Sequence, residues 1–196
     1  YSDDWSENKI KINKFIINII CTNHFYSNIL VEVYLMLVGE FDLMNLLTDE
    51  IKLRDDFLYN LEWYDSNEDY DKFCENNKKN ETNRGYVLFL INIMKKGFIS
   101  REYLCEMVDK LLCRLNESIS LDGNQGIVEE ISELSFILIK NAYDELREHD
   151  RWESLYIEIK KILEFKAKNF KSLSNKTIFK FMDLNDYIVN EESKKN

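Results

Sequence analysis

Apolar side chains recur along most of this chain at intervals of three and four residues. This is the period of an α-helix that buries one face, whereas a half-buried strand alternates at every second residue. The pattern therefore favours helices, even where β-branched isoleucine is abundant. It predicts about eight of them, near 8–21, 27–40, 43–64, 85–95, the stretch from Ser100 to Leu112, 125–143, 150–168 and 175–190.

The segments between these helices carry several boundary signals. Residues 65–83 are acidic, rich in asparagine and without an apolar period, so we expect an internal loop there. Gly97 stands where a C-terminal cap belongs, and Ser100 is placed to cap the next helix. Asp150 and Glu153 have the spacing of a capping box, which predicts the start of the seventh helix.

Composition and connection lengths refine the expected architecture. The 196 residues include no proline and five glycines, and 45% are apolar, so we expect one helical domain over 1–196. Short links favour antiparallel neighbours, and helix starts near 85, 126 and 175 repeat with about the period of HEAT-type helix pairs. The sequence thus predicts an all-α chain, an α-solenoid of stacked antiparallel helix pairs in a HEAT-like superhelix, with a compact helical bundle as the alternative.

The residue types that carry catalysis are not arranged for it. His24 and His149 belong to no nucleophile motif, and the glycines form no phosphate-binding loop, so we expect no enzyme activity. Cys21 and His24 have C-x-x-H spacing without a second pair, so neither a metal nor a cofactor is expected. The longest apolar runs are too short to cross a bilayer, which predicts no membrane partner.

The cysteines indicate a reducing compartment. No two of them form a C-x-x-C motif. The favoured interpretation is reduced, packed thiols in a cytoplasmic protein, with a disulfide or a metal site as the alternative. The four cysteines are Cys21, Cys74, Cys105 and Cys113. The chain opens at Tyr1 and not at a methionine, so we expect it to be a piece of a longer protein.

Two consecutive helical segments, between Gly85 and Leu112, carry an ordered set of residues around a short basic turn. They resemble a signature of the middle domain of the gamma scaffold subunit of eukaryotic initiation factor 4. In that family a helix of the type G-N-I-x-F-I-G-E-L-F is followed by a basic turn and a helix of the type C-x-x-x-L-L. The matching residues here are Gly85, Phe89, Leu90, Ile93, Lys95, Lys96, Leu111 and Leu112.

The resemblance continues towards the C-terminus. The stretch from Lys171 to Ile188 is similar to the family's K-x-x-S-x-R-I-x-F-M-L-x-D-L-x-D-L-R, although Ile188 replaces the terminal arginine. The matching residues are Lys171, Ser174, Lys176, Phe179, Asp183, Leu184 and Asp186. Between the two signatures, Leu138, Ile139 and Leu146 match the apolar positions of a further family helix. The glycine and glutamate of the family's F-I-G-E-L core are missing, so the order of elements matches better than the fine motif.

This resemblance implies a HEAT-repeat domain that binds a DEAD-box RNA helicase, holds its two lobes half-closed and speeds its cycle. It also implies contacts with mRNA and with other initiation factors. We therefore expect a monomeric, cytoplasmic scaffold domain of translation initiation. The alternative is an RNA-processing or decay adaptor of the same fold, which bridges proteins without stimulating a helicase. Heavy use of asparagine, lysine and isoleucine is typical of AT-rich genomes, such as those of some protists and large DNA viruses.

Charge and aromatic residues mark two candidate surfaces. The candidate helicase-binding residues are Trp5, Phe25, Lys95, Lys96 and Phe98, where Phe98 has a helix staple as its alternative role. The net charge is −10, but the window 160–180 is basic. Its lysines are the candidate RNA-binding residues, and a solvated helix face is the alternative: Lys160, Lys161, Lys166, Lys168, Lys171, Lys176 and Lys180.

Overall fold

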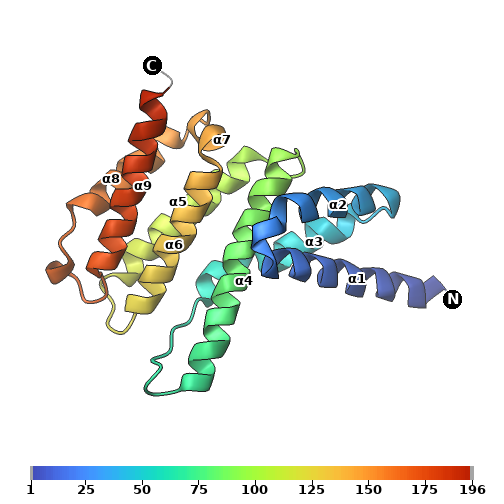
Figure 1. Ribbon diagram of the computed structural model, residues 1–196, viewed down its shortest axis with the longest axis horizontal. Coiled ribbons are helices and arrows are strands. Elements are labelled where there is room, and N and C mark those ends of the chain that lie inside the picture. Colours follow the sequence, from blue (N-terminus) through green and yellow to red (C-terminus); the bar gives the residue numbers. More distant parts are fainter. Residues whose placement is uncertain (1, 195–196) are drawn as a thin grey trace.

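In the computed structural model, every regular element within the described residues, 2–194, is a helix (Figure 1). The side chains of residues 1–6 and of Asp55 lie outside the described part. The α-helices are α1 (Ser2–Thr22), α2 (Ser27–Glu40), α3 (Met44–Arg54), α4 (Tyr70–Lys95), α5 (Arg101–Ser118), α6 (Gln125–Asn141), α7 (Tyr143–Arg147), α8 (Trp152–Glu164) and α9 (Asn175–Ser193). Three 3₁₀ turns accompany them: η1 (His24–Tyr26), η2 (Asp55–Asn60) and η3 (Ala167–Asn169). The all-α prediction is confirmed, with nine α-helices in this part where eight were expected.

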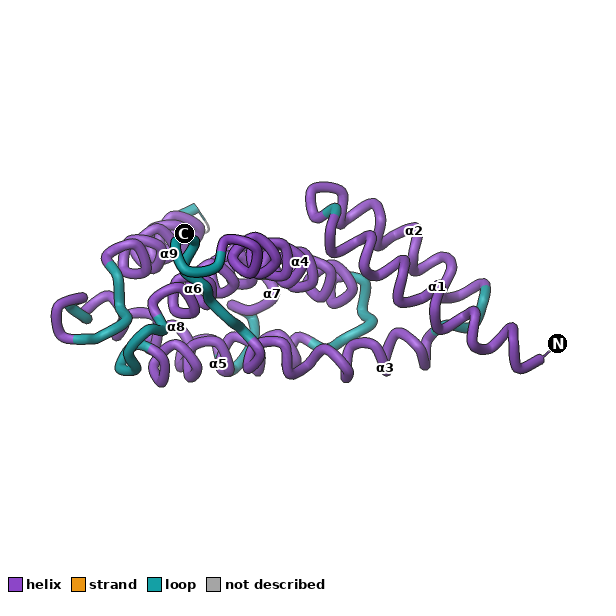
Figure 2. The backbone as a smooth tube through the Cα atoms, turned by 90° about the horizontal axis from the view of Figure 1, so that it is seen from below, coloured by secondary structure: helices purple, strands orange, loops and turns teal. Residues whose placement is uncertain are grey.

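The helices pack in two rows, which Figure 2 shows edge-on. In one row α1 contacts α4, α4 contacts α6, and α6 contacts α9. In the other, α5 contacts η2 on one side and α8 on the other. The rows are joined where α5 packs on α6 and α8 on α9. The core lies between the rows, and the apolar stripe of α6 (Ile131, Leu134 and Leu138) is completely buried in it.

The predicted loop at 65–83 is wrong for most of its length. Helix α4 begins at Tyr70, and the side chain of Asp69 caps it by accepting a hydrogen bond from the Lys72 backbone N–H at 3.0 Å. Before Gly85, the buried residue of α4 is the polar Asn76, so this first half of the helix has no apolar stripe. A helix whose surface is polar all round gives no periodic signal. The irregular segment is therefore confined to 61–69.

The two caps expected around residue 97 are confirmed. Gly97 adopts φ +82°, and its N–H donates to the Met94 carbonyl at 2.8 Å, while the Phe98 N–H donates to the Ile93 carbonyl at 2.9 Å. These bonds form a Schellman motif, in which glycine accepts the left-handed conformation without steric cost. At the start of α5, the Ser100 hydroxyl accepts a hydrogen bond from the backbone N–H of Tyr103.

Other predicted boundaries are wrong. The capping box of Asp150 and Glu153 does not form, because α8 begins at Trp152 and follows Arg151 without a side-chain cap. The guanidinium of Arg151 instead reaches back to α5 and pairs with Glu102 at 2.9 Å and Asp109 at 2.7 Å. The third, sixth and seventh predicted helices also end early, at Arg54, Asn141 and Glu164, and a short 3₁₀ turn or helix follows each of them.

Candidate protein-binding surface at the N-terminal helix pair

Helices α1 and α2 form an antiparallel pair closed by η1, and this pair lies at one end of the described part (Figures 1 and 2). Each helix buries one stripe. Ile17 and Ile20 of α1 are buried, as are Val31 and Val38 of α2. These positions are spaced by three and seven residues, so each set lies on one helical face. The pair is thereby held against α4 and α3.

A buried polar contact fixes the pair. The Tyr34 hydroxyl donates to Asn13 Oδ1 at 2.7 Å, and Asn13 Nδ2 donates to the Leu46 carbonyl at 3.3 Å. Both side chains are buried, and burial raises the pKa of Tyr34 well above its ordinary value. A buried hydroxyl needs a partner, so this chain of bonds specifies one arrangement of α1, α2 and α3.

The outer side of the same pair is also apolar. Met36 is 74% exposed and lies with Ile29 and Val33 on the opposite side of α2 from the buried stripe. Phe15, on α1, is 65% exposed. A helix that is apolar all round is ordinarily buried on all sides. We call these outward residues the N-terminal apolar face: Ile12, Phe15, Phe25, Tyr26, Ile29, Val33 and Met36.

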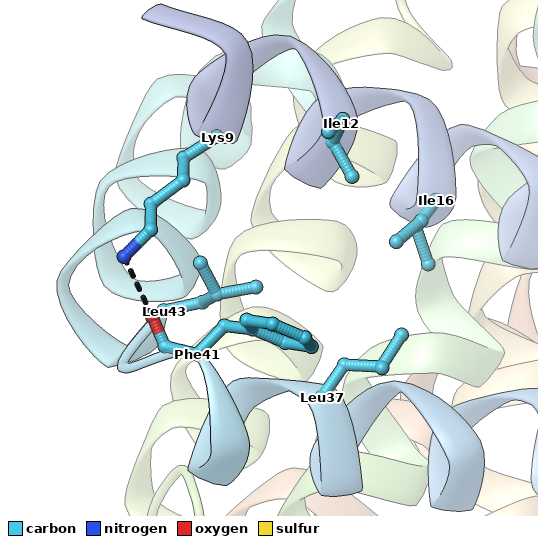
Figure 3. Close-up of a pocket in the computed structure, with 6 residues that line it drawn as sticks. All are labelled: Lys9, Ile12, Ile16, Leu37, Phe41 and Leu43. Carbon is cyan, nitrogen blue, oxygen red and sulfur yellow. Dashed lines mark hydrogen bonds between the residues drawn. The ribbon is translucent and has the colours of Figure 1, made fainter. Parts of the chain in front are cut away.

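A groove runs between α1 and α2 beside this face (Figure 3). Its volume is about 180 Å³, and its walls are apolar: Ile12, Ile16, Leu37, Phe41 and Leu43. Lys9 stands at one end, where its Nζ donates to the Phe41 carbonyl at 2.9 Å. This carbonyl follows the last turn of α2, so the ammonium neutralises the negative end of the helix dipole. The groove has the size and lining to receive an apolar side chain.

The predicted helicase-binding residues separate into two groups. Phe25 is 86% exposed in η1 and packs edge-to-face on Tyr26, with ring centroids 5.1 Å apart. Lys96 lies against α2, where its Nζ is 2.7 Å from Glu32. Phe25 and Lys96 therefore both border the N-terminal helix pair.

The remaining members of that set lie elsewhere. Lys95 turns towards the end of α6 and towards α7, where its Nζ donates to the Asn141 carbonyl at 2.7 Å and lies 3.8 Å from Glu145. Phe98 lies in the turn between α4 and α5, where its side chain is half-buried against the core. The side chain of Trp5 lies outside the described residues.

The predicted RNA-binding lysines do not form one basic patch. Lys176 pairs with Glu129, and Lys180 pairs with Glu133, both at 2.7 Å across α9 and α6. Each ammonium is thus already matched by a carboxylate.

The other five lysines lie on α8 or the connection after it. Lys161 pairs with Glu158 on its own helix, and Lys160 Nζ stands 4.3 Å from the ring centroid of Tyr156. The exposed remainder sits around η3: Lys166, Lys168 and Lys171. The basic window of the sequence is therefore reduced to exposed Lys160 on α8 and a three-lysine connection.

The N-terminal apolar face contains residues that the sequence pattern did not single out. The sequence pattern placed Ile29 and Val33 on one apolar stripe of the helix 27–40 together with Tyr34, but of these three only Tyr34 is buried. The stripe was wrong because a helix that is apolar on all sides does not reveal which side faces water. The usable signal was this lack of a polar face in α2, which is typical of helices that are buried on all sides.

Within the described residues, no three His, Cys, Asp or Glu side chains converge as metal ligands, and all four cysteines are free thiols. None of the helices in this part of the chain combines the length and apolarity needed to span a bilayer. Comparison with protein-family models, curated proteins and solved structures finds no match.

Proposed function

We propose that this chain is a HEAT-like α-solenoid that acts as a scaffold domain of translation initiation. Its N-terminal apolar face docks a DEAD-box RNA helicase and thereby stimulates the helicase's ATPase cycle. It works by binding and not by catalysis, as a monomeric domain in the cytoplasm, with mRNA and other initiation factors as further partners.

The arrangement of helices supports the solenoid. A solenoid stacks helix pairs so that each pair contacts its neighbours, which produces two rows. Here the row α1, α4, α6 and α9 lies over the row that contains α5 and α8. In such an array a terminal pair needs a polar outer side, unless another molecule covers it. The pair α1 and α2 is apolar on that side.

The positions of the family-like segments support the class of scaffold. The first signature, Gly85 to Leu112, occupies the second half of α4 and most of α5. The second, Lys171 to Ile188, occupies the turn before α9 and α9 itself, where the Ser174 hydroxyl caps the helix by accepting from the Thr177 N–H. The matched order of residues thus coincides with an order of packed helices.

The single observation that carries the docking proposal is the N-terminal apolar face, with Phe25 86% exposed at its edge. Exposed aromatic and methionine side chains in a patch are typical of protein interfaces. The chain has a net charge of −10, which favours a positively charged partner. The RNA-binding surfaces of helicase lobes are positive and are attracted to it.

Pull-down and ATPase assays with purified DEAD-box helicases test this proposal. We expect the chain to retain a translation-initiation helicase and to raise its RNA-dependent ATPase rate. Phe25→Asp and Met36→Asp should each abolish both effects, because a charge in an apolar contact is costly. The matched control is Phe179→Asp, since Phe179 is also exposed but lies on α9 at the other end of the described part.

The outcomes separate the candidate functions. Binding with stimulation, lost in Phe25→Asp and kept in Phe179→Asp, supports the proposal. Binding without stimulation indicates the adaptor of RNA processing or decay instead. If no helicase binds, or if Phe25→Asp binds as well as wild type, helicase docking at this face is wrong.

A further inference from the structure

A second surface feature lies away from the N-terminal apolar face, between the first half of α4, α6 and α9. It is a pocket of about 290 Å³. Its walls come from four parts of the chain: Trp63 in the irregular segment, Asn76 and Asn80 on α4, Glu130 on α6, and Lys176 on α9. Most of its lining is polar or charged, and Trp63 is its large aromatic ring, so it is suited to a polar ligand and not to an apolar one.

The α4 wall contributes hydrogen-bond acceptors that have no partner. Asn76 is 5% exposed, and its Nδ2 donates to the Glu62 carbonyl at 2.8 Å, which leaves Oδ1 as the acceptor to be satisfied. Within the described residues neither Asn76 Oδ1 nor Asn80 Oδ1 accepts a hydrogen bond. The two residues are one helical turn apart, so their side chains lie on one face of α4. Buried acceptors of this kind favour a ligand that brings donors.

Trp63 supplies a flat apolar surface beside these acceptors. A Cβ built on Gly126 would stand 1.6 Å from Trp63 Cδ1, so the indole lies directly on the α6 backbone where only glycine leaves room. Trp63 as a whole residue is nevertheless 45% exposed. An indole fixed on one face and open on the other is suited to stack with a planar cation.

The charged residues in and around the pocket favour a cationic ligand over an anionic one. Inside the pocket the acids and bases are matched, because Arg84 pairs with Glu130, Lys176 with Glu129 and Lys180 with Glu133. The segment 62–75, whose Trp63 and Phe73 line the pocket, has six carboxylates (Glu62, Asp65, Glu68, Asp69, Asp71 and Glu75) and one lysine, Lys72. Glu62 pairs with Lys79 and Asp69 with Lys72, and the other four carboxylates leave this rim of the pocket acidic. A cation approaching along this rim is attracted, and a phosphate is repelled.

We infer that this pocket binds an arginine side chain presented by a basic segment of a partner protein. Guanidinium is planar, carries five N–H donors and no acceptor, and stacks on aromatic rings. It matches the open indole face of Trp63, the acceptors Asn76 Oδ1 and Asn80 Oδ1, and the acidic rim. RNA fits less well, because its phosphates require free cations and the pocket's lysines are already paired.

The test uses the 196-residue chain labelled with ¹⁵N and a capped tripeptide, acetyl-Gly-Arg-Gly-amide, followed by NMR. The peptide should shift the Trp63 indole N–H signal, which is assigned with Trp63→Phe, and the side-chain amide signals of Asn76 and Asn80. The same peptide with citrulline in place of arginine keeps the shape and loses the charge. We expect it to bind about tenfold more weakly, because hydrogen bonds to charged donors are the stronger ones.

Variants separate this site from the helicase-docking face. Asn80→Leu, which removes one acceptor, should weaken arginine-peptide binding about tenfold. Phe25→Asp should leave it unchanged, so a failure here is distinguishable from a failure of helicase docking. Equal binding of the citrulline and arginine peptides, or no shift of the Trp63 signal at millimolar arginine peptide, would overturn the inference. So would a Trp63 shift caused by a uridine oligonucleotide but not by the arginine peptide, which would assign the pocket to RNA.

Discussion

The backbone of Gly85 lies directly against the carbonyl of Cys21, so that a Cβ built on Gly85 would stand 1.7 Å from this oxygen. This contact is the point where α4 crosses α1. It joins the N-terminal pair, which carries the apolar face, to the central helix of the array. Because the obstructing atom belongs to the backbone, a side chain at position 85 is accommodated only if the two helices move apart.

The first prediction concerns this crossing. Gly85→Ala should lower the free energy of unfolding by at least about 2 kcal/mol, since overpacking in a well-packed contact costs this much. Gly39→Ala is the matched control, because a Cβ on Gly39 meets nothing within 4 Å. There the change should stabilise α2 by about 0.5–1 kcal/mol. Urea unfolding followed by circular dichroism measures both, and equal effects would contradict the close contact.

The second prediction concerns the ion pair between Arg84 and Glu130, which ties α4 to α6. Arg84 Nε donates to Glu130 Oε1 at 2.9 Å and Nη2 donates to Oε2, and the Glu130 side chain is buried. Arg84→Met leaves that carboxylate without its partner, so we expect a loss of about 3 kcal/mol in unfolding free energy. The double variant Arg84→Met, Glu130→Met should recover most of it, because an apolar pair replaces the ion pair.

An exposed pair serves as the control for this cycle. Arg101 and Glu148 are 2.8 Å apart, and both side chains are about half exposed or more. Arg101→Met should change the unfolding free energy by less than about 1 kcal/mol, as is usual for surface pairs. If the double variant at 84 and 130 is no more stable than Arg84→Met, the ion pair is not the reason for the loss.

The sequence predicted the helices whose burial is one-sided. The range of α2 was predicted as 27–40 and observed as Ser27–Glu40, and α9 begins at Asn175, directly after its Ser174 cap. The sequence pattern did not predict the first half of α4, because this half is stabilised by the Asp69 cap and by buried Asn76 and not by an apolar stripe. The spacing of Asp150 and Glu153 also predicted a capping box. This box does not form, and the neighbouring Arg151 pairs with Glu102 of α5 instead.

The candidate surfaces were harder to predict for a related reason. A sequence shows that α2 is apolar but not which of its sides is covered, so Met36 was not singled out although Phe25 was. The pairing of Lys176 with Glu129 joins residues 47 apart in the chain, and no local pattern reports it. A count of lysines within a window of the sequence includes only residues that are close along the chain. Whether each lysine is paired with a carboxylate depends on residues that are close in space.

The third prediction compares two helix ends with the same geometry. Asp42 follows α2 with φ 52°, and the Leu43 N–H donates to the Val38 carbonyl at 3.0 Å, as Phe98 does to Ile93 after α4. The left-handed conformation costs a non-glycine residue roughly 1–2 kcal/mol. Asp42→Gly should therefore raise the unfolding free energy by about 1 kcal/mol, and Gly97→Ala should lower it by a similar amount. Thermal unfolding should show opposite shifts of Tm, and shifts of the same sign would refute the assignment.

The fourth prediction concerns acid stability and Glu129 on α6. Burial acts to raise the pKa of Glu129, but hydrogen bonds from Lys176, Gln125 and Ser174 outweigh it, so this pKa lies below its ordinary value. The folded protein then binds this proton more weakly than the unfolded chain. The resulting stabilisation is complete above the unfolded glutamate pKa of about 4.3 and is lost as the pH falls through the folded pKa.

Urea unfolding between pH 7 and pH 3 measures this contribution for wild type and for Glu129→Gln. We expect wild type to be the more stable protein at pH 7, and the difference to shrink progressively below about pH 5, where carboxylates in the unfolded chain begin to bind protons. Lys176→Met should reduce the same pH dependence, because it removes the ammonium that holds Glu129 ionised. A difference between wild type and Glu129→Gln that stays constant or grows towards pH 3 would show that the carboxylate's charge does not stabilise the contact between α6 and α9.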